Sequence, residues 1–254
     1  MRAGRFDLAE SVAVTQGILA ALSSVRTRDA LLDLMRAIAS DLGFRHFALI
    51  HHADLREPVP GRVNIKDYPA AITERIIDQG CWRRDPVVRG SLFADGAFLW
   101  SNISALIQLD RRDREALAYG ASLGLNEGIT VPFALLGKCP GSCTFAGMRY
   151  PRRAERLLGI AQMVGIFAFQ AARRIEGDVP EPAPPPRLHP RPRDCVALAG
   201  RGCSNKQIAR ALGLAPRTVD GYLTVARRLF SARDRTELVI SAILAGEVSL
   251  DELR

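Results

Sequence analysis

The sequence predicts an α+β protein with two domains, of which the first contains an antiparallel sheet and the second is entirely α-helical. Strand-like and helix-like apolar patterns alternate over residues 8–175, which is typical of helices packed on a sheet. A proline-rich segment then interrupts both patterns. The residues that follow it show only the spacing of amphipathic helices.

The spacing of apolar residues predicts the elements of the first domain. Helices are expected over residues 8–25, 28–42 (with Thr27 as the N-cap), 69–79, 110–123 and 151–175. Strands are expected over residues 46–51, 62–65, 98–100, 129–135 and 142–150. The last two strands form a hairpin, because the segment between them is rich in glycine and proline.

The boundary between the domains is predicted at residues 177–187, where five of the residues are prolines. Proline has no N–H donor and a fixed φ, so this segment can form neither a helix nor a central strand. It is expected to be an extended, semi-rigid linker. The predicted domains are therefore residues 1–176 and 188–254.

Composition limits the classes of protein to consider. The 254 residues carry a net charge of +8, which favours polyanionic partners such as nucleic acids. No apolar run is long enough to span a bilayer, and the N-terminus does not resemble a signal peptide, so we expect a cytoplasmic protein with no membrane partner. The five cysteines are scattered and odd in number, which predicts neither a disulfide framework nor a metal site.

Residues 204–219 predict a helix-turn-helix, in which the second helix enters the major groove of DNA. The first helix is amphipathic, and a turn containing Gly213 separates it from the second. The inward residues of the two helices are expected to be Ile208, Ala209, Leu212, Val219, Leu223, Ala226 and Leu229.

The outward face of these helices is the predicted DNA-binding surface. Asp220 and Thr224 are expected to contact base edges, because they follow the start of the second helix. Basic and hydroxyl groups around them suit phosphate contacts. The remaining members of the surface are Lys206, Arg217, Thr218, Gly221, Arg227 and Arg228. The alternative is a small helical bundle whose basic face is merely solvated.

The motifs of the second domain resemble those of the LuxR-type regulators. They are LHPR at 188–191, CVALAGRG at 195–202, SNKQIA at 204–209, RTV at 217–219 and RL at 228–229. The resemblance implies a four-helix unit that binds double-stranded DNA as a homodimer on two half-sites, with RNA polymerase as a further candidate partner. Pro192 stands where the family has glutamate, so the first helix is expected to start a few residues late.

The first domain resembles the quorum-sensing branch of that family, the receptors for acyl-homoserine lactones. The matching motifs are Tyr68-Pro69, DPVV at 85–88, Trp100, Gly124-Leu125 and GITVP at 128–132. The resemblance implies an α-β-α sandwich whose antiparallel sheet and helices enclose a ligand pocket. It implies that Asp85 accepts a hydrogen bond from the ligand amide, that Tyr68, Val87 and Trp100 line the pocket, and that Thr144 lies near the acyl carbonyl.

Two positions depart from that branch. Ile72 and Ile76 stand where the branch has a tryptophan, which donates to the lactone carbonyl, and a second tyrosine. A buried carbonyl without its donor costs about 1–3 kcal/mol, or up to about a hundredfold in affinity. The pocket could accept a lactone in another way, hold a different apolar molecule, or be filled by its own side chains.

These patterns predict a DNA-binding transcriptional regulator, not an enzyme, that responds to a small apolar signal. An acyl- or aroyl-homoserine lactone is the favoured signal, and no other cofactor is expected. One alternative is a ligand-independent regulator whose first domain is a scaffold for dimerisation or partner binding. In the plainest alternative Tyr68 and Trp100 are core aromatics and Asp85 is a helix cap. An enzyme acting on acyl amides is disfavoured, because no nucleophile or histidine accompanies Asp85 and Tyr68.

Overall fold

The computed structural model describes residues 8–56, 59–135, 138–177 and 186–254. The described part of the chain separates into two compact units, an N-terminal one up to residue 177 and a C-terminal one of residues 186–254. Most of the predicted linker, and part of the turn predicted between the hairpin strands, lie outside the described residues. Each unit is described by itself.

The N-terminal unit contains one antiparallel sheet of five strands in the order β2-β1-β5-β4-β3. These strands are β1 (His46–His51), β2 (Asn64–Lys66), β3 (Phe98–Leu99), β4 (Gly128–Phe133) and β5 (Gly141–Ala146). The predicted hairpin is confirmed, since β4 and β5 pair with Val131 opposite Cys143. The central strand β5 is buried along its whole length, so its side chains show no polar alternation.

Four strand predictions were wrong at their ends. The two hairpin strands end at Phe133 and Ala146, not at residues 135 and 150. The second strand begins at Asn64, not Arg62, because the N–H of Val63 donates to the Nδ1 atom of His51 at 2.8 Å. The third strand ends at Leu99, and Trp100 instead begins a 3₁₀ turn, Trp100–Ala105.

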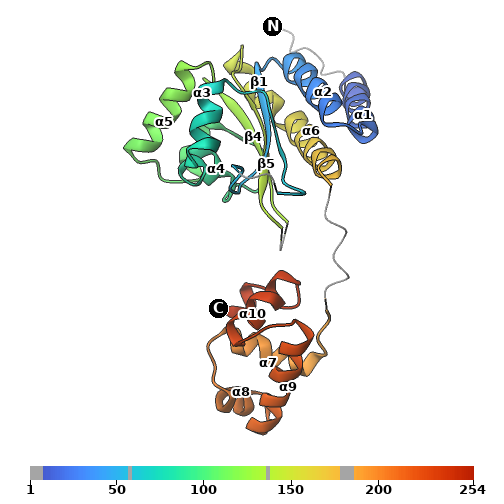
Figure 1. Ribbon diagram of the computed structural model, residues 1–254, viewed down its shortest axis with the longest axis vertical. Helices are drawn as coiled ribbons and strands as arrows, with labels where there is room; N and C mark the ends of the chain where they lie inside the picture. The colour runs from blue at the N-terminus through green and yellow to red at the C-terminus, as the bar shows by residue number, and fades with distance from the viewer. Residues whose placement is uncertain (1–7, 57–58, 136–137, 178–185) are drawn as a thin grey trace. The chain divides into compact units, whose positions relative to one another are not determined.

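Helices cover both faces of the sheet, which confirms the α-β-α sandwich (Figure 1). One face carries α1 (Leu8–Ser24), α2 (Arg28–Asp41) and α6 (Ala154–Ile175). The other carries the shorter helices α3 (Ala70–Thr73), α4 (Pro86–Ser91) and α5 (Arg111–Ser122). Thr27 caps α2 as predicted, since its hydroxyl accepts from the N–H of Ala30 at 3.3 Å.

The main core lies between the sheet and the layer of α1, α2 and α6. The largest side chains with almost no exposure there include Phe44, Phe47, Phe145, Phe169 and Met35. Helix α6 follows a 3₁₀ turn, Pro151–Arg153, and buries Val164 and Ala168 against the sheet, while Met163 and Phe167 are exposed on its other side.

The C-terminal unit is a bundle of four helices, as predicted. They are α7 (Pro190–Gly200), α8 (Asn205–Leu212), α9 (Pro216–Leu229) and α10 (Arg235–Leu244). Ser204 and Gln207 form a capping box at the start of α8, and Gly213 ends that helix with a φ of 65°.

Two predictions for this unit were wrong. Helix α7 does not start late, because it begins at Pro190 and holds Pro192 in its first turn. Residues of the first turn have no intrahelical acceptor for their N–H groups, so a proline there breaks no hydrogen bond. Leu229, expected in the core, is 43% exposed at the end of α9.

A comparison of two glycines of α6 tests how closely this helix packs on the sheet. A Cβ atom added to Gly165 would lie 2.8 Å from side-chain atoms of Val131, whereas one added to Gly159 meets nothing within 4 Å. We expect Gly165→Ala to lower the free energy of unfolding by about 1–3 kcal/mol. Gly159→Ala should raise it by about 0.5–1 kcal/mol, because alanine is the better helix former. Urea denaturation of both variants measures this, and equal effects would contradict the close packing.

Candidate ligand pocket and DNA-binding surface

A cavity of about 730 Å³ lies between the sheet and the layer of α3, α4 and α5. Its walls come from segments far apart in the sequence, including β5, the 3₁₀ turn at Trp100 and all three helices. All of the residues predicted to bind ligand line it, namely Tyr68, Ile72, Ile76, Asp85, Val87, Trp100 and Thr144. The structure therefore brings the predicted set together around one cavity.

Asp85 is positioned by the helix that it caps. Its Oδ1 atom accepts hydrogen bonds from the N–H groups of Val87, at 2.9 Å, and Val88, at 3.1 Å. Among the described residues none donates to Oδ2. Burial raises the pKa of this carboxyl group, and the two N–H groups oppose that rise. The capping interpretation is thus correct, and it leaves one carboxylate oxygen available in the cavity.

A chain of hydroxyl groups crosses the sheet side of the cavity. The indole N–H of Trp100 donates to the hydroxyl of Thr130 at 2.9 Å, and that hydroxyl lies 3.1 Å from the hydroxyl of Thr144. Burial and the negative charge of Asp85 raise the pKa of Tyr68 above its usual range, while a hydrogen bond with Thr144 opposes the rise. The indole N–H of Trp100 therefore already has a hydrogen-bond partner within the protein. The phenol of Tyr68 stays protonated at neutral pH.

The two isoleucines form an apolar wall. Ile72 is 4% exposed and packs with Leu125 and Ala146, while Ile76 lies partly buried beside the same cluster. The chain between them enters a π-helical turn, Glu74–Asp78, a geometry that is often found at functional sites. Neither side chain offers a donor to a ligand.

Charged residues also line the cavity, and the sequence analysis did not identify them. They are Arg75, Arg83, Arg84, Arg89, Arg112, Asp110, Asp113 and Glu115. Arg89 donates from one nitrogen to both carboxylate oxygens of Asp113, at 2.8 and 2.9 Å, and so joins α4 to α5. Asp113 also shares a capping box with Asp110 at the start of α5. The sequence signal was weak, because charges in a helical pattern usually indicate a solvated face.

A buried histidine supports the cavity wall. The Nε2 atom of His52 lies 3.0 Å from the hydroxyl of Ser142, which lines the cavity, and its Nδ1 atom faces Ser91 of α4 at 3.5 Å. Burial, with a smaller contribution from His51, lowers the pKa of His52 to about 4. At neutral pH this side chain is an uncharged link between the sheet and α4.

The predicted DNA-binding residues lie on α8 and α9. Helix α9 buries Val219, Leu223 and Ala226 against the bundle, so its opposite face is free. On that face Thr224 and Arg227 are partly buried, and the guanidinium of Arg227 donates to the Thr224 hydroxyl at 3.3 Å. The remaining members are exposed, namely Lys206, Arg217, Thr218, Asp220, Gly221 and Arg228.

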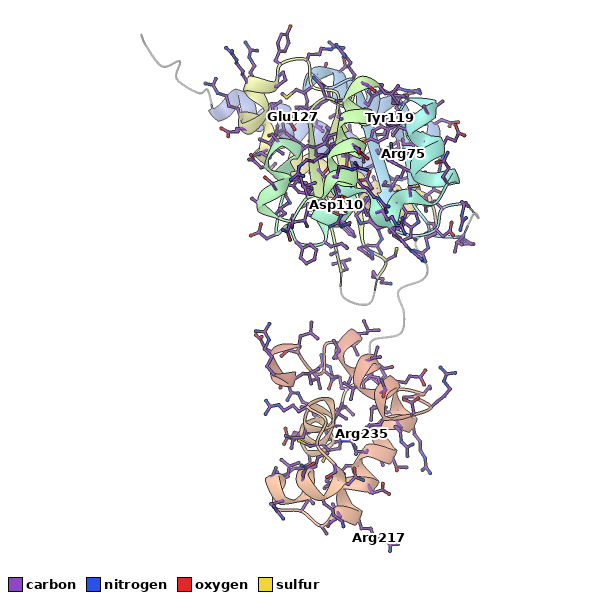
Figure 2. The ribbon with its side chains drawn as sticks, turned by 90° about the vertical axis from the view of Figure 1, so that its left-hand side faces the viewer. Arg75, Asp110, Tyr119, Glu127, Arg217 and Arg235 are labelled. Atoms are coloured by element: carbon purple, nitrogen blue, oxygen red, sulfur yellow. The ribbon has the colours of Figure 1, made fainter. Side chains whose placement is uncertain are left out.

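A polar network that the sequence analysis missed holds Asp220 in place. Asn205 donates from its amide to Asp220 at 3.3 Å, and its carbonyl accepts from Arg235 at 3.0 Å. Arg235 also donates to the carbonyl of Cys203. Figure 2 labels Arg217 at an exposed end of this unit and Arg235 within it. The network ties the start of α8 to α9 and α10, and no local sequence signal predicts it.

Comparisons with known families agree with both parts of this geometry. A family model described as "Autoinducer binding domain" matches residues 27–172, and one described as "Bacterial regulatory proteins, luxR family" matches residues 187–242. The chain belongs to the LuxR family of autoinducer-binding regulators. Members of these families are transcriptional regulators rather than enzymes, and the four-helix unit of this LuxR-type protein is its DNA-binding part.

Curated relatives of this LuxR-type protein are similar over most of its length. The transcriptional activator protein BjaR1 of Bradyrhizobium diazoefficiens is 27% identical over 217 residues, which cover 83% of this chain and 87% of that protein. The transcriptional activator protein AnoR of Acinetobacter nosocomialis is 22% identical over 236 residues, covering 91% and 97% of the two chains.

Solved structures of the family share the fold of this LuxR-type protein. Escherichia coli SdiA superimposes with a TM-score of 0.57 at 16% identity, covering 94% of this chain and 99% of that one. The N-acylhomoserine lactone dependent LuxR family factor CepR2 of Burkholderia cenocepacia superimposes with a TM-score of 0.51 at 18% identity, covering 65% and 96%. At such identities the likeness establishes the fold alone.

Within the described residues, no helix is long and apolar enough to cross a membrane. The same residues hold no cluster of side chains that could bind a metal ion, and their cysteines are free thiols.

The buried His52 predicts a stability that depends on pH. The folded state favours the neutral ring, so the unfolded chain takes up a proton first as the pH falls from 6.5 towards 4. We expect the free energy of unfolding to be constant above pH 6.5 with respect to this group and to fall by about 3 kcal/mol across that window. Urea denaturation at several pH values measures the change.

Replacing the histidine separates its contribution from that of other titrating groups. His52→Gln should be less stable at neutral pH but should lose most of the added pH dependence. His189→Gln, at an exposed position of the other unit, should keep it. An unchanged pH profile in His52→Gln would contradict this assignment.

Proposed function

We propose that this protein is a transcriptional regulator whose N-terminal domain binds an N-acylated signal, most simply an acyl- or aroyl-homoserine lactone, and which binds DNA as a homodimer. The observation that carries the proposal is the Asp85 carboxylate, which lines an open cavity and accepts two backbone hydrogen bonds on one oxygen only. A carboxylate held in this way needs a donor from a ligand, and the N–H of an amide is such a donor.

The size and chemistry of the cavity support an acylated signal. A volume of about 730 Å³ falls within the usual range for small-molecule sites. Apolar side chains suited to an acyl chain or an aromatic ring face the polar row of Tyr68 and Thr144. Among structures with this fold, CepR2 is described as dependent on N-acylhomoserine lactone, and one SdiA structure contains octanoyl-rac-glycerol.

The cavity argues against a purely structural role for the N-terminal domain. If its own side chains filled the space between the helices and the sheet, Ile72 and Ile76 would close it. They pack instead on Leu125 and leave about 730 Å³ open beside them. A ligand-independent scaffold is therefore the weaker candidate.

The proposed assembly follows from the surfaces of the two units. Helix α9 presents a polar face for the major groove, and a homodimer would place two such helices on two half-sites. Met163 and Phe167, exposed on α6, are candidates for the dimer contact. We propose residues 1–176 as the sensor domain, 177–187 as the linker and 188–254 as the DNA-binding domain, acting on DNA in the cytoplasm with RNA polymerase as a candidate partner.

Asp85→Asn separates the two roles of this residue. Asparagine is as good an N-cap as aspartate, so the melting temperature without ligand should change little. Its amide group presents a donor where the carboxylate presents an acceptor, so the affinity for N-octanoyl-homoserine lactone should fall about 10- to 100-fold. Isothermal titration calorimetry and thermal melting measure both quantities.

A second capping aspartate provides the matched control. Asp234 caps α10 by accepting from the N–H of Glu237 at 2.8 Å, in the other unit. Asp234→Asn should leave ligand affinity unchanged. If the wild type melts at the same temperature with and without a range of acyl and aroyl lactones, ligand sensing of this kind is refuted.

Substitutions on α9 test the DNA-binding surface. Arg217→Ala should weaken binding to all duplexes alike and lower the slope of log affinity against log salt by about 1, as expected for a lost phosphate contact. Asp220→Ala should instead change the sequence preference, because this residue is predicted to contact bases. Arg254→Ala, at an 87% exposed side chain in the last turn, is the control. Fluorescence anisotropy at several salt concentrations measures these effects, and a uniform loss in Asp220→Ala would contradict its predicted role.

A further inference from the structure

Arg75 is a cationic group in the ligand cavity, and none of the carboxylates that the structure describes pairs with it. It lies in the π-helical turn between the two isoleucines and lines the cavity together with them. No hydrogen bond or ion pair joins its guanidinium to any side chain that the structure describes. Arg89, by contrast, also lines the cavity but is bound to Asp113.

An aromatic ring holds the guanidinium of Arg75 in place. Its Cζ atom lies 4.9 Å from the centroid of the Tyr119 ring on α5, and Tyr119 also lines the cavity. Figure 2 shows these two side chains close together. Stacking of this kind occupies the face of the guanidinium and leaves its N–H groups, which lie at the edge, free to donate.

Arg75 is also close enough to Asp85 to affect it. The positive charge of Arg75 opposes the rise in the pKa of Asp85 that burial causes. The same cavity is therefore lined by an acceptor, the Asp85 carboxylate, and by a fork of charged donors, the Arg75 guanidinium. A ligand that satisfies both needs an N–H group and an oxygen acceptor.

We propose that Arg75 binds the head group of the signal, and that the signal is an N-acylated amino acid whose carboxyl function lies against this guanidinium, either free or closed as a lactone. This inference rests on the proposed function and specifies its ligand. Ile72 and Ile76 are the predicted ligand-binding residues nearest to Arg75 in the sequence, and their side chains have no hydrogen-bond donor. A guanidinium can donate two parallel hydrogen bonds to a carboxylate or a single bond to a lactone carbonyl.

Three ligands with one acyl chain separate the parts of the head group. They are N-octanoyl-homoserine lactone, its ring-opened acid N-octanoyl-homoserine, and N-cyclopentyl octanamide, which keeps the amide and a five-membered ring but has no carboxyl oxygen. With the full-length wild type, the lactone, the acid or both should bind at least tenfold more tightly than the cyclopentyl amide. Which of the two binds more tightly shows whether the carboxyl function is free or closed.

Variants of Arg75 then connect that preference to one side chain. Arg75→Met should remove about tenfold or more of the affinity for the carboxyl-bearing ligands and leave the cyclopentyl amide within about threefold. Arg75→Lys keeps the charge without the fork, so it should restore part of the binding of the acid. Arg153→Met is the matched control and should leave the affinity for all three ligands unchanged, because Arg153 also stacks on an aromatic ring, at 5.5 Å from the centroid of Tyr150, but does not line the cavity.

The outcomes distinguish this inference from the proposed function. If the wild type binds all three ligands equally, or if Arg75→Met keeps the full preference, the role of Arg75 is refuted while amide sensing stands. If the wild type binds none of them, the proposed function fails and this inference fails with it. Should Arg75→Met not fold, the wild-type ligand series and Arg75→Lys decide the question.

Discussion

The Asp85 carboxylate at the start of α4 is the interaction on which the rest of the N-terminal domain depends. The N–H groups of Val87 and Val88 bind one oxygen and thereby fix the rotation of the carboxyl group. The second oxygen is then held in the cavity without any need for a long, flexible side chain. A helix cap, which many proteins use only for stability, here also orients a buried acceptor.

The cavity exists because the two faces of the sheet are covered differently. Helix α6, of 22 residues, lies close against β4, with Gly165 directly over Val131. The opposite face carries the shorter helices α3 and α4, of 4 and 6 residues, and the carboxylate of Asp85 caps the start of α4. Short helices joined through pairs such as Arg89 and Asp113 can stand away from the sheet and leave space beneath them.

Much of this arrangement was predictable from the sequence, since the motifs around Tyr68, Asp85 and Trp100 indicated which segments would meet. The start of β2 was not, because the N–H of Val63 donates to the side chain of His51, twelve residues away, and no local pattern shows such a bond. Leu229 was misplaced because helical spacing shows which face is apolar but not where the neighbouring helix ends. The spacing of apolar residues predicts which face of a helix or strand is buried. Contacts between segments distant in the sequence decide where the helix or strand begins and ends.

Arg75 illustrates the same difficulty for a functional group. The sequence analysis did not single it out, because the ring of Tyr119 on which its guanidinium stacks in the cavity comes from a helix more than forty residues later. The Arg75 guanidinium and the Asp85 carboxylate are two charged groups that are partly removed from water. This is costly in free energy unless their hydrogen-bonding groups find partners. A ligand that supplies those partners would bind only the folded domain, and at a hundred times its Kd would add about 2.7 kcal/mol to its stability. Since whole domains are stable by about 5–15 kcal/mol, signal binding and the folding of this domain are expected to be strongly linked.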